Sequence, residues 1–213
     1  MDEEEKFAAC SCEDFTKKLA AKTPVPGGGG AAALAGALAV SLCSMTAGFT
    51  KGKKKYARYE ADIERILIET DNIRRQLLKL IDEDAESFKP LSQAYAMPKD
   101  DPDRAKVIEE ASLKACEAPL AMMAEICHAI SLTAEAAEKG STLMISDTAC
   151  AAYLGAAALQ AASLNVFINT RELGSSSQAR EIEEKAHQML DEFLPLATKT
   201  AQEAAEKVMG EEK

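Results

Sequence analysis

Asp84 is the carboxylate whose place in the sequence points most directly to chemistry. It lies four residues after Leu80 and four before Phe88, inside an apolar stripe that repeats at steps near three and four. Residues at this spacing share one face of a helix, so the carboxylate is directed towards the interior. Unpaired buried carboxylates are costly, and such groups are paired, protonated or functional. The spacing fits a functional carboxylate and a partly exposed residue at the rim of a bundle equally well.

A second set of polar residues marks the two ends of another apolar segment. Asp147 follows Ser146 where a helix is expected to begin, and Asn165 and Asn169 lie one turn apart near its end. Helical spacing places Asp147 and both asparagines on one face, where they could contact a ligand. The simpler interpretations are a helix N-cap for Asp147 and interhelical hydrogen bonds for the two amides.

A run of glycines precedes the first long apolar segment. Without side chains, its backbone N–H groups could approach a ligand at a helix N-terminus. The run lacks the Gly-Lys-Ser/Thr ending of a phosphate-binding P-loop, and a flexible turn is the alternative interpretation. The candidate residues are Gly27, Gly28, Gly29 and Gly30.

One basic cluster stands out in an otherwise acidic chain. It could attract a polyanionic tail, but the simpler interpretation is that it ends a helix and keeps the chain soluble, since most charge runs are solvated. Neither His128 nor His187 belongs to a recognisable catalytic triad or metal-ligand set, so the sequence predicts no metal site. The cluster comprises Lys51, Lys53, Lys54 and Lys55.

Helices must position these residues, because no segment shows the alternation of a β-strand. Breaks rich in Gly and Pro predict a single all-α domain, residues 1–213, built as a bundle of about six helices. The two uncharged, Ala-rich segments, near residues 31–50 and 148–170, are expected to form its centre. The expected helices span about 11–22, 31–50, 56–96, 102–139, 147–171 and 178–208.

Composition narrows the class of protein. The chain has 213 residues, 47% of them hydrophobic, and a formal net charge of −10. That charge argues against nucleic acid as the main partner. The six cysteines form no Cys-x-x-Cys pair and fit reduced thiols in a cytosol. The acidic stretch Met1–Lys6 does not resemble a signal peptide, so a cytoplasmic location is expected.

The uncharged segment from Ala31 to Phe49 is long enough to cross a bilayer. It consists mainly of small residues, which drive membrane insertion weakly, so a buried central helix is the favoured interpretation and no membrane partner is expected. So much small-residue surface on long helices also favours a homo-oligomer.

Several blocks together resemble the cyclodeaminase/cyclohydrolase family. That family includes the C-terminal domain of formiminotransferase-cyclodeaminase and free-standing methenyltetrahydrofolate cyclohydrolases. At one position the sequence departs from the family, which often has Asn where Ser141 follows Gly140. The blocks, in the family's order, are Thr23–Gly29, Gly52–Tyr56, Asp82–Phe88, Met97–Lys99, Ser146-Asp147 and Asn165–Asn169.

The resemblance implies a homodimer or larger homo-oligomer with a folate pocket between helices. Members act on the carbon that bridges two tetrahydrofolate nitrogens and need no metal or redox cofactor. On this basis Asp84 and Asp147 are the expected acid/base and cation-stabilising groups, and Asn165 and Asn169 are expected to orient folate or water. The remaining substrate contacts are expected from the Gly27–Gly30 wall, from Ser146, and, for a polyglutamylated tail, from Lys53, Lys54, Lys55, Tyr56 and Lys99.

Three functions remain open from the sequence. Hydrolysis of 5,10-methenyltetrahydrofolate to 10-formyltetrahydrofolate is favoured, because the sequence contains no formiminotransferase domain. Cyclodeamination of formimidoyltetrahydrofolate, which releases ammonia and forms the methenyl compound, is the alternative. A folate-binding helical oligomer without turnover is the third, and would fit if the Asn replaced by Ser141 is essential.

Overall fold

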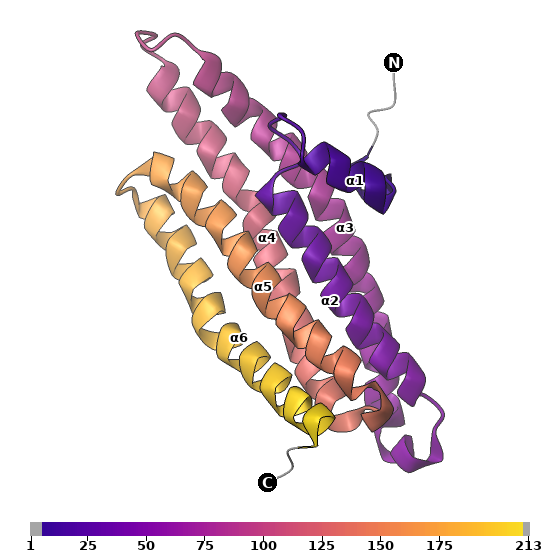
Figure 1. Ribbon diagram of the computed structural model, residues 1–213. Helices are drawn as coiled ribbons and strands as arrows, with labels where there is room; N and C mark the ends of the chain where they lie inside the picture. The colour runs from indigo at the N-terminus through magenta and orange to yellow at the C-terminus, as the bar shows by residue number, and fades with distance from the viewer. Residues whose placement is uncertain (1–5, 211–213) are drawn as a thin grey trace.

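The computed structural model describes residues 6–210, and within that range the chain is helical with no strand (Figure 1). The prediction of an all-α fold with about six helices is confirmed. The stretch Met1–Glu5, on which the expectation about a signal peptide rests, lies outside the described residues. The α-helices are α1 (Cys12–Leu19), α2 (Gly28–Thr50), α3 (Glu60–Ala96), α4 (Arg104–Lys139), α5 (Ile145–Thr170) and α6 (Ser177–Met209).

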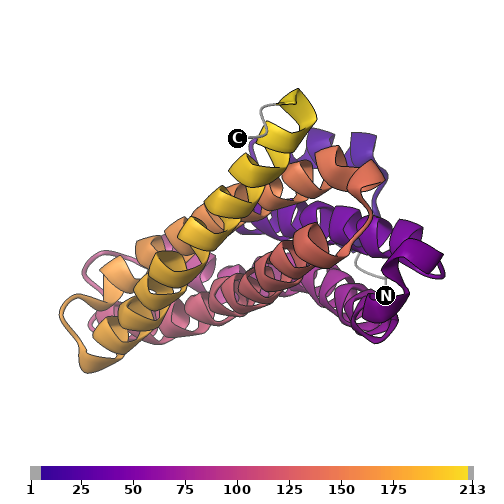
Figure 2. The ribbon, with the colours of Figure 1, turned by 90° about the horizontal axis from the view of Figure 1, so that it is seen from below.

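The five long helices pack in two layers (Figures 1 and 2). Helices α3 and α4 form one layer, α2 and α5 the other, and α6 flanks α5. Helices α2 and α5 run antiparallel: the hydroxyls of Thr46 and Thr148 lie 3.1 Å apart near one end, while Asn165 approaches Gly28 near the other. This register decides which predicted site residues can meet.

Small residues let α2 pack closely against its neighbours. Ala33, Val40 and Cys43 are fully buried, and a Cβ on Gly36 would lie 2.9 Å from Ile126 Cγ1 of α4. Protein interiors have almost no free volume, so a larger residue at position 36 would push these helices apart. The six cysteines are all unpaired, as predicted.

Two helix boundaries differ from the sequence-based prediction. Helix α2 begins at Gly28, so Gly28–Gly30 form its first turn rather than a loop, with Gly27 as N-cap. Helix α5 begins at Ile145, because the 3₁₀ turn Thr142–Met144 continues straight into it. The prediction that Asp147 is an N-cap is therefore wrong: it is the third residue of the helix, where a carboxylate still interacts favourably with the helix dipole.

Three segments are long and apolar enough to cross a membrane by length and composition: Gly28–Thr50, Arg104–Lys139 and Thr142–Leu173. The bundle buries only about half of each. The prediction of a buried α2 therefore holds for one side only, because the outward faces of α2 and α5 stay uncovered (Figure 1). We call this uncovered surface the α2–α5 stripe; its large exposed residues are Leu38, Phe49, Tyr153, Leu164 and Ile168.

Candidate active site

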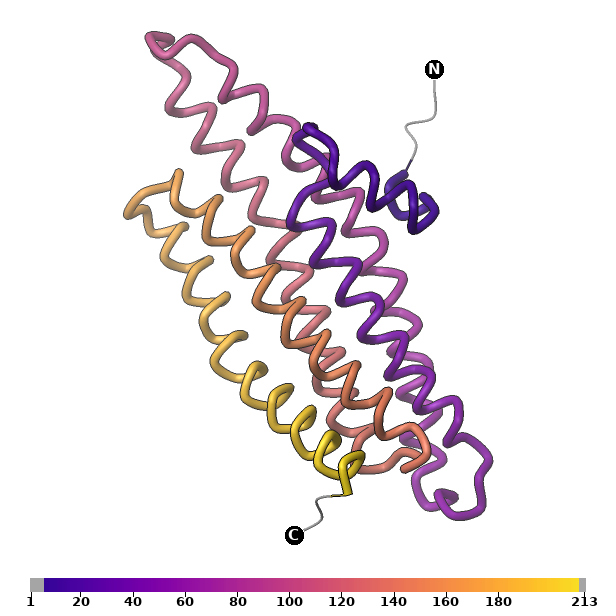
Figure 3. Tube along the Cα trace, viewed as in Figure 1, coloured from indigo at the N-terminus to yellow at the C-terminus, as the bar shows by residue number. Residues whose placement is uncertain are grey.

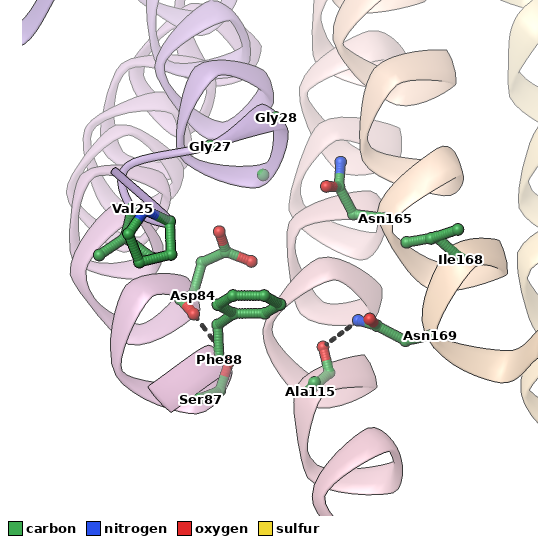
Figure 4. Close-up of a pocket in the computed structure, with 12 residues that line it drawn as sticks. Val25, Gly27, Gly28, Asp84, Ser87, Phe88, Ala115, Asn165, Ile168 and Asn169 are labelled. Atoms are coloured by element: carbon green, nitrogen blue, oxygen red, sulfur yellow. Dashed lines mark hydrogen bonds between the residues drawn. The ribbon is translucent and has the colours of Figure 1, made fainter. Parts of the chain in front are cut away.

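A pocket of about 180 Å³ lies where the N-terminus of α2 meets α3 and the C-terminal part of α5 (Figure 4). It contains the central candidate of the sequence, Asp84, together with most of the glycine run and both asparagines. The pocket is lined by Pro24, Val25, Gly27, Gly28, Gly29, Asp84, Ser87, Phe88, Ala115, Asn165, Ile168 and Asn169.

Helix α3 projects Asp84 into this pocket, towards the side that carries Asn165 (Figure 4). The stripe that aims it is the one predicted, since Leu77, Leu80 and Ile81 of the same helix are fully buried. Burial raises the pKa of Asp84 to about 6, and a hydrogen bond from the backbone N–H of Gly30 acts in the opposite direction. None of the lining residues is Lys or Arg. The carboxyl group can therefore both take and give a proton near neutral pH.

The absence of a side chain on Gly29 creates the space that Asp84 occupies. A Cβ on Gly29 would overlap both carboxylate oxygens and would lie 2.6 Å from the carboxyl carbon. Gly30 is different, because a Cβ there would meet Ile81 and Pro26 at an ordinary 3.5 Å. The glycine run thus brings the first turn of α2 directly against the carboxylate.

The two asparagines have different environments. The Asn169 side chain is 8% exposed and donates a hydrogen bond of 2.8 Å to the carbonyl of Ala115 on α4. Asn165 donates within its own helix, to the carbonyl of Ala161, and its amide oxygen lies over Gly28 at the pocket mouth. Asn165 is therefore the better placed to orient a ligand or water, whereas Asn169 ties α5 to α4 beside the pocket.

The raised pKa of Asp84 predicts a pH-dependent stability. The carboxyl binds its proton more tightly in the folded chain than in the unfolded chain, so its stabilising contribution is present below about pH 4 and is lost as pH rises through about 6. Asn cannot ionise, so only wild type loses this contribution. We expect the free energy of unfolding of Asp84→Asn minus that of wild type to be roughly 1–3 kcal/mol larger at pH 7 than at pH 4. Urea denaturation at both pH values measures this, and a difference that does not change with pH would contradict it.

Apart from Lys99, the remaining predicted residues lie at the opposite end of the bundle, where the start of α5 lies beside the segment that leaves α2 (Figure 3). Asp147 directly precedes Thr148, which contacts Thr46 of α2. Eighteen residues of α5 separate Asp147 from Asn165, or about 27 Å along the helix. Within one chain, Ser146 and Asp147 therefore do not reach the Asp84 pocket.

Polar contacts organise this far end. Lys53 Nζ donates to Ser141 Oγ at 3.1 Å, and the backbone N–H of Thr142 donates to the Tyr56 hydroxyl at 3.2 Å. Hydrogen bonding to Thr142, with the nearby Lys55 ammonium, lowers the pKa of Tyr56 to about 8. Ser141, the residue that departs from the family pattern, is thus a direct partner of the basic cluster.

Lys99, Lys54 and Lys55 are exposed. Lys99 lies in the turn between α3 and α4, beyond the end of α3, and Lys54 and Lys55 project from the 3₁₀ turn Lys54–Tyr59. Twelve residues of α3 separate Asp84 from Ala96, about 18 Å, so Lys99 stands well outside the pocket. Among the described residues, no three His, Cys, Asp or Glu side chains are grouped to hold a metal ion.

The sequence did not predict several pocket residues. Phe88 looked like a core residue of the α3 stripe, yet its ring lines the pocket beside Asp84 (Figure 4). Ala115 lies on α4, and nothing in its sequence surroundings distinguishes it from other buried alanines. Ile168 lies between the two asparagines, and it was indicated by the sequence only as a member of the family block Asn165–Asn169. It is 56% exposed at the pocket mouth.

Comparison with known proteins shows which family the chain belongs to. The sequence pattern of formiminotransferase-cyclodeaminase matches residues 11–188. The chain belongs to this family. The match contains all of the predicted site residues and the helices α1 to α5, and it ends at residue 188, within α6.

Three relatives show how far the similarity extends. A methenyltetrahydrofolate cyclohydrolase of Methylorubrum extorquens is 39% identical over 173 residues, 79% of this chain and 83% of that protein. Mouse formimidoyltransferase-cyclodeaminase is 26% identical over 90% of this chain but only 35% of its own length. The crystal structure of a formiminotetrahydrofolate cyclodeaminase from Thermotoga maritima superposes with a TM-score of 0.81 at 27% identity, covering 92% of this chain and 98% of that one.

Proposed function

We propose that this chain is a methenyltetrahydrofolate cyclohydrolase, which converts 5,10-methenyltetrahydrofolate to 10-formyltetrahydrofolate. The observation that carries the proposal is Asp84, a half-buried carboxyl group with a pKa raised to about 6 in a pocket whose lining contains no cationic side chain. Such a group suits a substrate that is itself a cation. The 39% identity to a cyclohydrolase over most of both chains supports this reaction.

The reaction requires water to add to the bridging carbon of a cationic amidinium. Asp84 stabilises the positive charge and takes a proton from the attacking water as the carbon–oxygen bond forms. The protonated Asp84 then gives that proton to the ring nitrogen as one carbon–nitrogen bond breaks. The hydroxyl proton leaves to solvent as the formyl carbonyl forms. Asn165 at the pocket mouth is placed to orient the water or the folate.

Cyclodeamination of formimidoyltetrahydrofolate is the second candidate, favoured by the TM-score of 0.81 to a cyclodeaminase over nearly the whole of both chains. That reaction passes through a similar tetrahedral carbon and expels ammonia, so the same carboxyl could serve both.

The further parts of the proposal concern assembly and location. The protein is proposed to be a cytoplasmic homodimer that binds a polyglutamylated folate and uses no metal or redox cofactor. The uncovered apolar α2–α5 stripe supports self-association.

Two assays on purified wild-type protein test the function. We expect the absorbance of methenyltetrahydrofolate to fall well above the buffer rate, and no ammonia to be released from formimidoyltetrahydrofolate. Release of ammonia would instead show that the protein is a cyclodeaminase. If neither assay detects turnover but the protein binds folate, it is the non-catalytic folate-binding oligomer.

A further inference from the structure

The Asp84 pocket of one chain is too small for a whole folate. Its volume is about 180 Å³, whereas sites for ligands of that size usually enclose about 300–1,000 Å³. The lining also offers no ammonium or guanidinium group for the glutamyl carboxylates of the substrate. One chain therefore supplies a place for the reacting cation but leaves the anionic half of the molecule without charged partners in the pocket.

The missing cations occur at the opposite end of the same two helices. We call the surface made by Lys53, Lys54, Lys55, Tyr56 and Ser141 the basic pole. The Ser141 hydroxyl accepts a hydrogen bond from the Lys53 ammonium. Among the described residues, none of the three lysines forms an ion pair with a carboxylate. Helix α2 separates the pole from the pocket by 23 residues, about 34 Å. A single folate cannot contact both within one chain.

The surface that connects pocket and pole is uncovered and has almost no charged residues. Helix α2 has no charged residue, and α5 has only Asp147, although the chain carries a net charge of −10. Large apolar side chains are exposed along its whole length, including Leu38 at 53% near the middle and Phe49 at 56% near the pole. Depletion of charge and exposure of apolar residues characterise the core of a protein interface.

A second copy of this chain can cover that surface in two ways. A twofold axis parallel to the helices would place pole against pole and Asp84 pocket against Asp84 pocket, bringing like charges together. A twofold axis across the helices instead places the basic pole of each copy over the acidic pocket of the other. Charge complementarity favours the second arrangement, and Ile168 lies on both the pocket rim and the stripe, so the covering copy would close the pocket.

We propose that two copies of this chain pack antiparallel through the α2–α5 stripe, so that the basic pole of each copy completes the Asp84 pocket of the other and binds the glutamyl carboxylates. This inference rests on the proposed folate function. In this arrangement, the reacting cation lies beside Asp84 of one protomer. The anionic tail lies on the basic pole of the partner. Two complete sites then form per dimer, one at each end.

Heterodimers of two defective variants test the proposal. One variant is Asp84→Asn; the other combines Lys53→Ala, Lys54→Ala and Lys55→Ala, for which we expect a loss of roughly ten- to a hundredfold in kcat/KM on a polyglutamylated substrate. Co-expression with two different affinity tags yields the heterodimer. If the site is shared, one of its two sites contains only intact residues, so about half of the wild-type kcat/KM returns. If each site lies within one chain, the heterodimer shows only the mean of the two defective parents.

The controls separate this proposal from the proposed function. A heterodimer of wild type with Asp84→Asn should retain about half of the activity in either case, and an inactive wild type would refute the function rather than the dimer. Full activity of the lysine variant alone, or no recovery in the heterodimer, would overturn the shared site.

A variant of the stripe gives a readout that does not depend on activity. We expect Leu38→Glu to be monomeric by light scattering, with unchanged helicity and at least tenfold lower kcat/KM, because a charge at the centre of the interface cannot be solvated. A dimer that survives Leu38→Glu would place the interface elsewhere. Wild-type protein that is extracted only with detergent would assign the stripe to a membrane instead.

Discussion

Asp84→Asn is expected to lower kcat for methenyltetrahydrofolate hydrolysis by about 10²–10⁴-fold while leaving the fold intact. Asparagine keeps the shape of the side chain but can neither take a proton from water nor carry the negative charge that faces the cation. The fold should survive, because Asp84 is half-buried, its pKa is raised to about 6, and burial of its charged form is unfavourable. Loss of methenyltetrahydrofolate absorbance measures kcat, and circular dichroism measures helicity.

A matched control on the same helix sharpens this test. Glu83→Gln makes the same carboxylate-to-amide change one residue away, at a side chain that pairs with Lys79 on the surface and does not line the pocket. We expect it to keep activity within a few-fold of wild type, since exposed ion pairs contribute little. In wild type, kcat/KM should rise as Asp84 ionises near pH 6, and this rise should be absent from Asp84→Asn. A folded, nearly fully active Asp84→Asn would remove Asp84 from the chemistry.

The fold followed closely from local sequence signals. The helix expected from about residue 11 does begin there, because the Ser11 hydroxyl caps α1 by accepting a 3.0 Å hydrogen bond from the backbone N–H of Asp14. The α1 helix ends at Leu19, slightly earlier than predicted, and α3 continues through Pro90 to Ala96. Such features depend on residues close together in the chain, which is why sequence patterns detect them.

The composition of the site was harder to predict, because it depends on contacts between distant segments. Periodicity indicated that Asp84 points inwards, but it could not indicate that the first turn of α2 would face it. Likewise, Asp147 and Asn165 share one helical face, and only the length of α5 shows that they stand at opposite ends of the bundle. The family resemblance grouped all these residues into one site, whereas one chain assembles only part of them.

In the proposed antiparallel dimer, the two ends of the bundle together form one substrate site. The carboxyl group of the pocket and the lysines of the pole carry opposite charges, and the two helices that connect them carry only one charged residue, Asp147. A long helix pair that separates its functional groups by about 34 Å is poorly suited to bind one small molecule within one chain. The same separation is well suited to an antiparallel pair, because each end of one copy meets the other end of its partner.

Gly29→Ala is expected to lower kcat/KM by about 10²-fold, although it adds a single methyl group. The new Cβ would overlap the carboxylate oxygens of Asp84 and lie 2.6 Å from its carboxyl carbon, so the side chain must move out of the pocket. A displacement of about 1 Å is enough to disrupt proton transfer to an attacking water. The methenyltetrahydrofolate absorbance assay measures the loss.

Gly30→Ala separates this steric effect from the general effect of adding alanine to the first turn of α2. Its Cβ would meet only Ile81 and Pro26, at 3.5 Å, and its backbone N–H would still donate to Asp84. We expect Gly30→Ala to keep activity within a few-fold of wild type and to unfold at a similar or higher temperature, since alanine has less conformational freedom to lose on folding. Equal losses in the two variants would show that α2 tolerates no side chain in this turn, and equal retention would show that Asp84 does not need the space that Gly29 leaves.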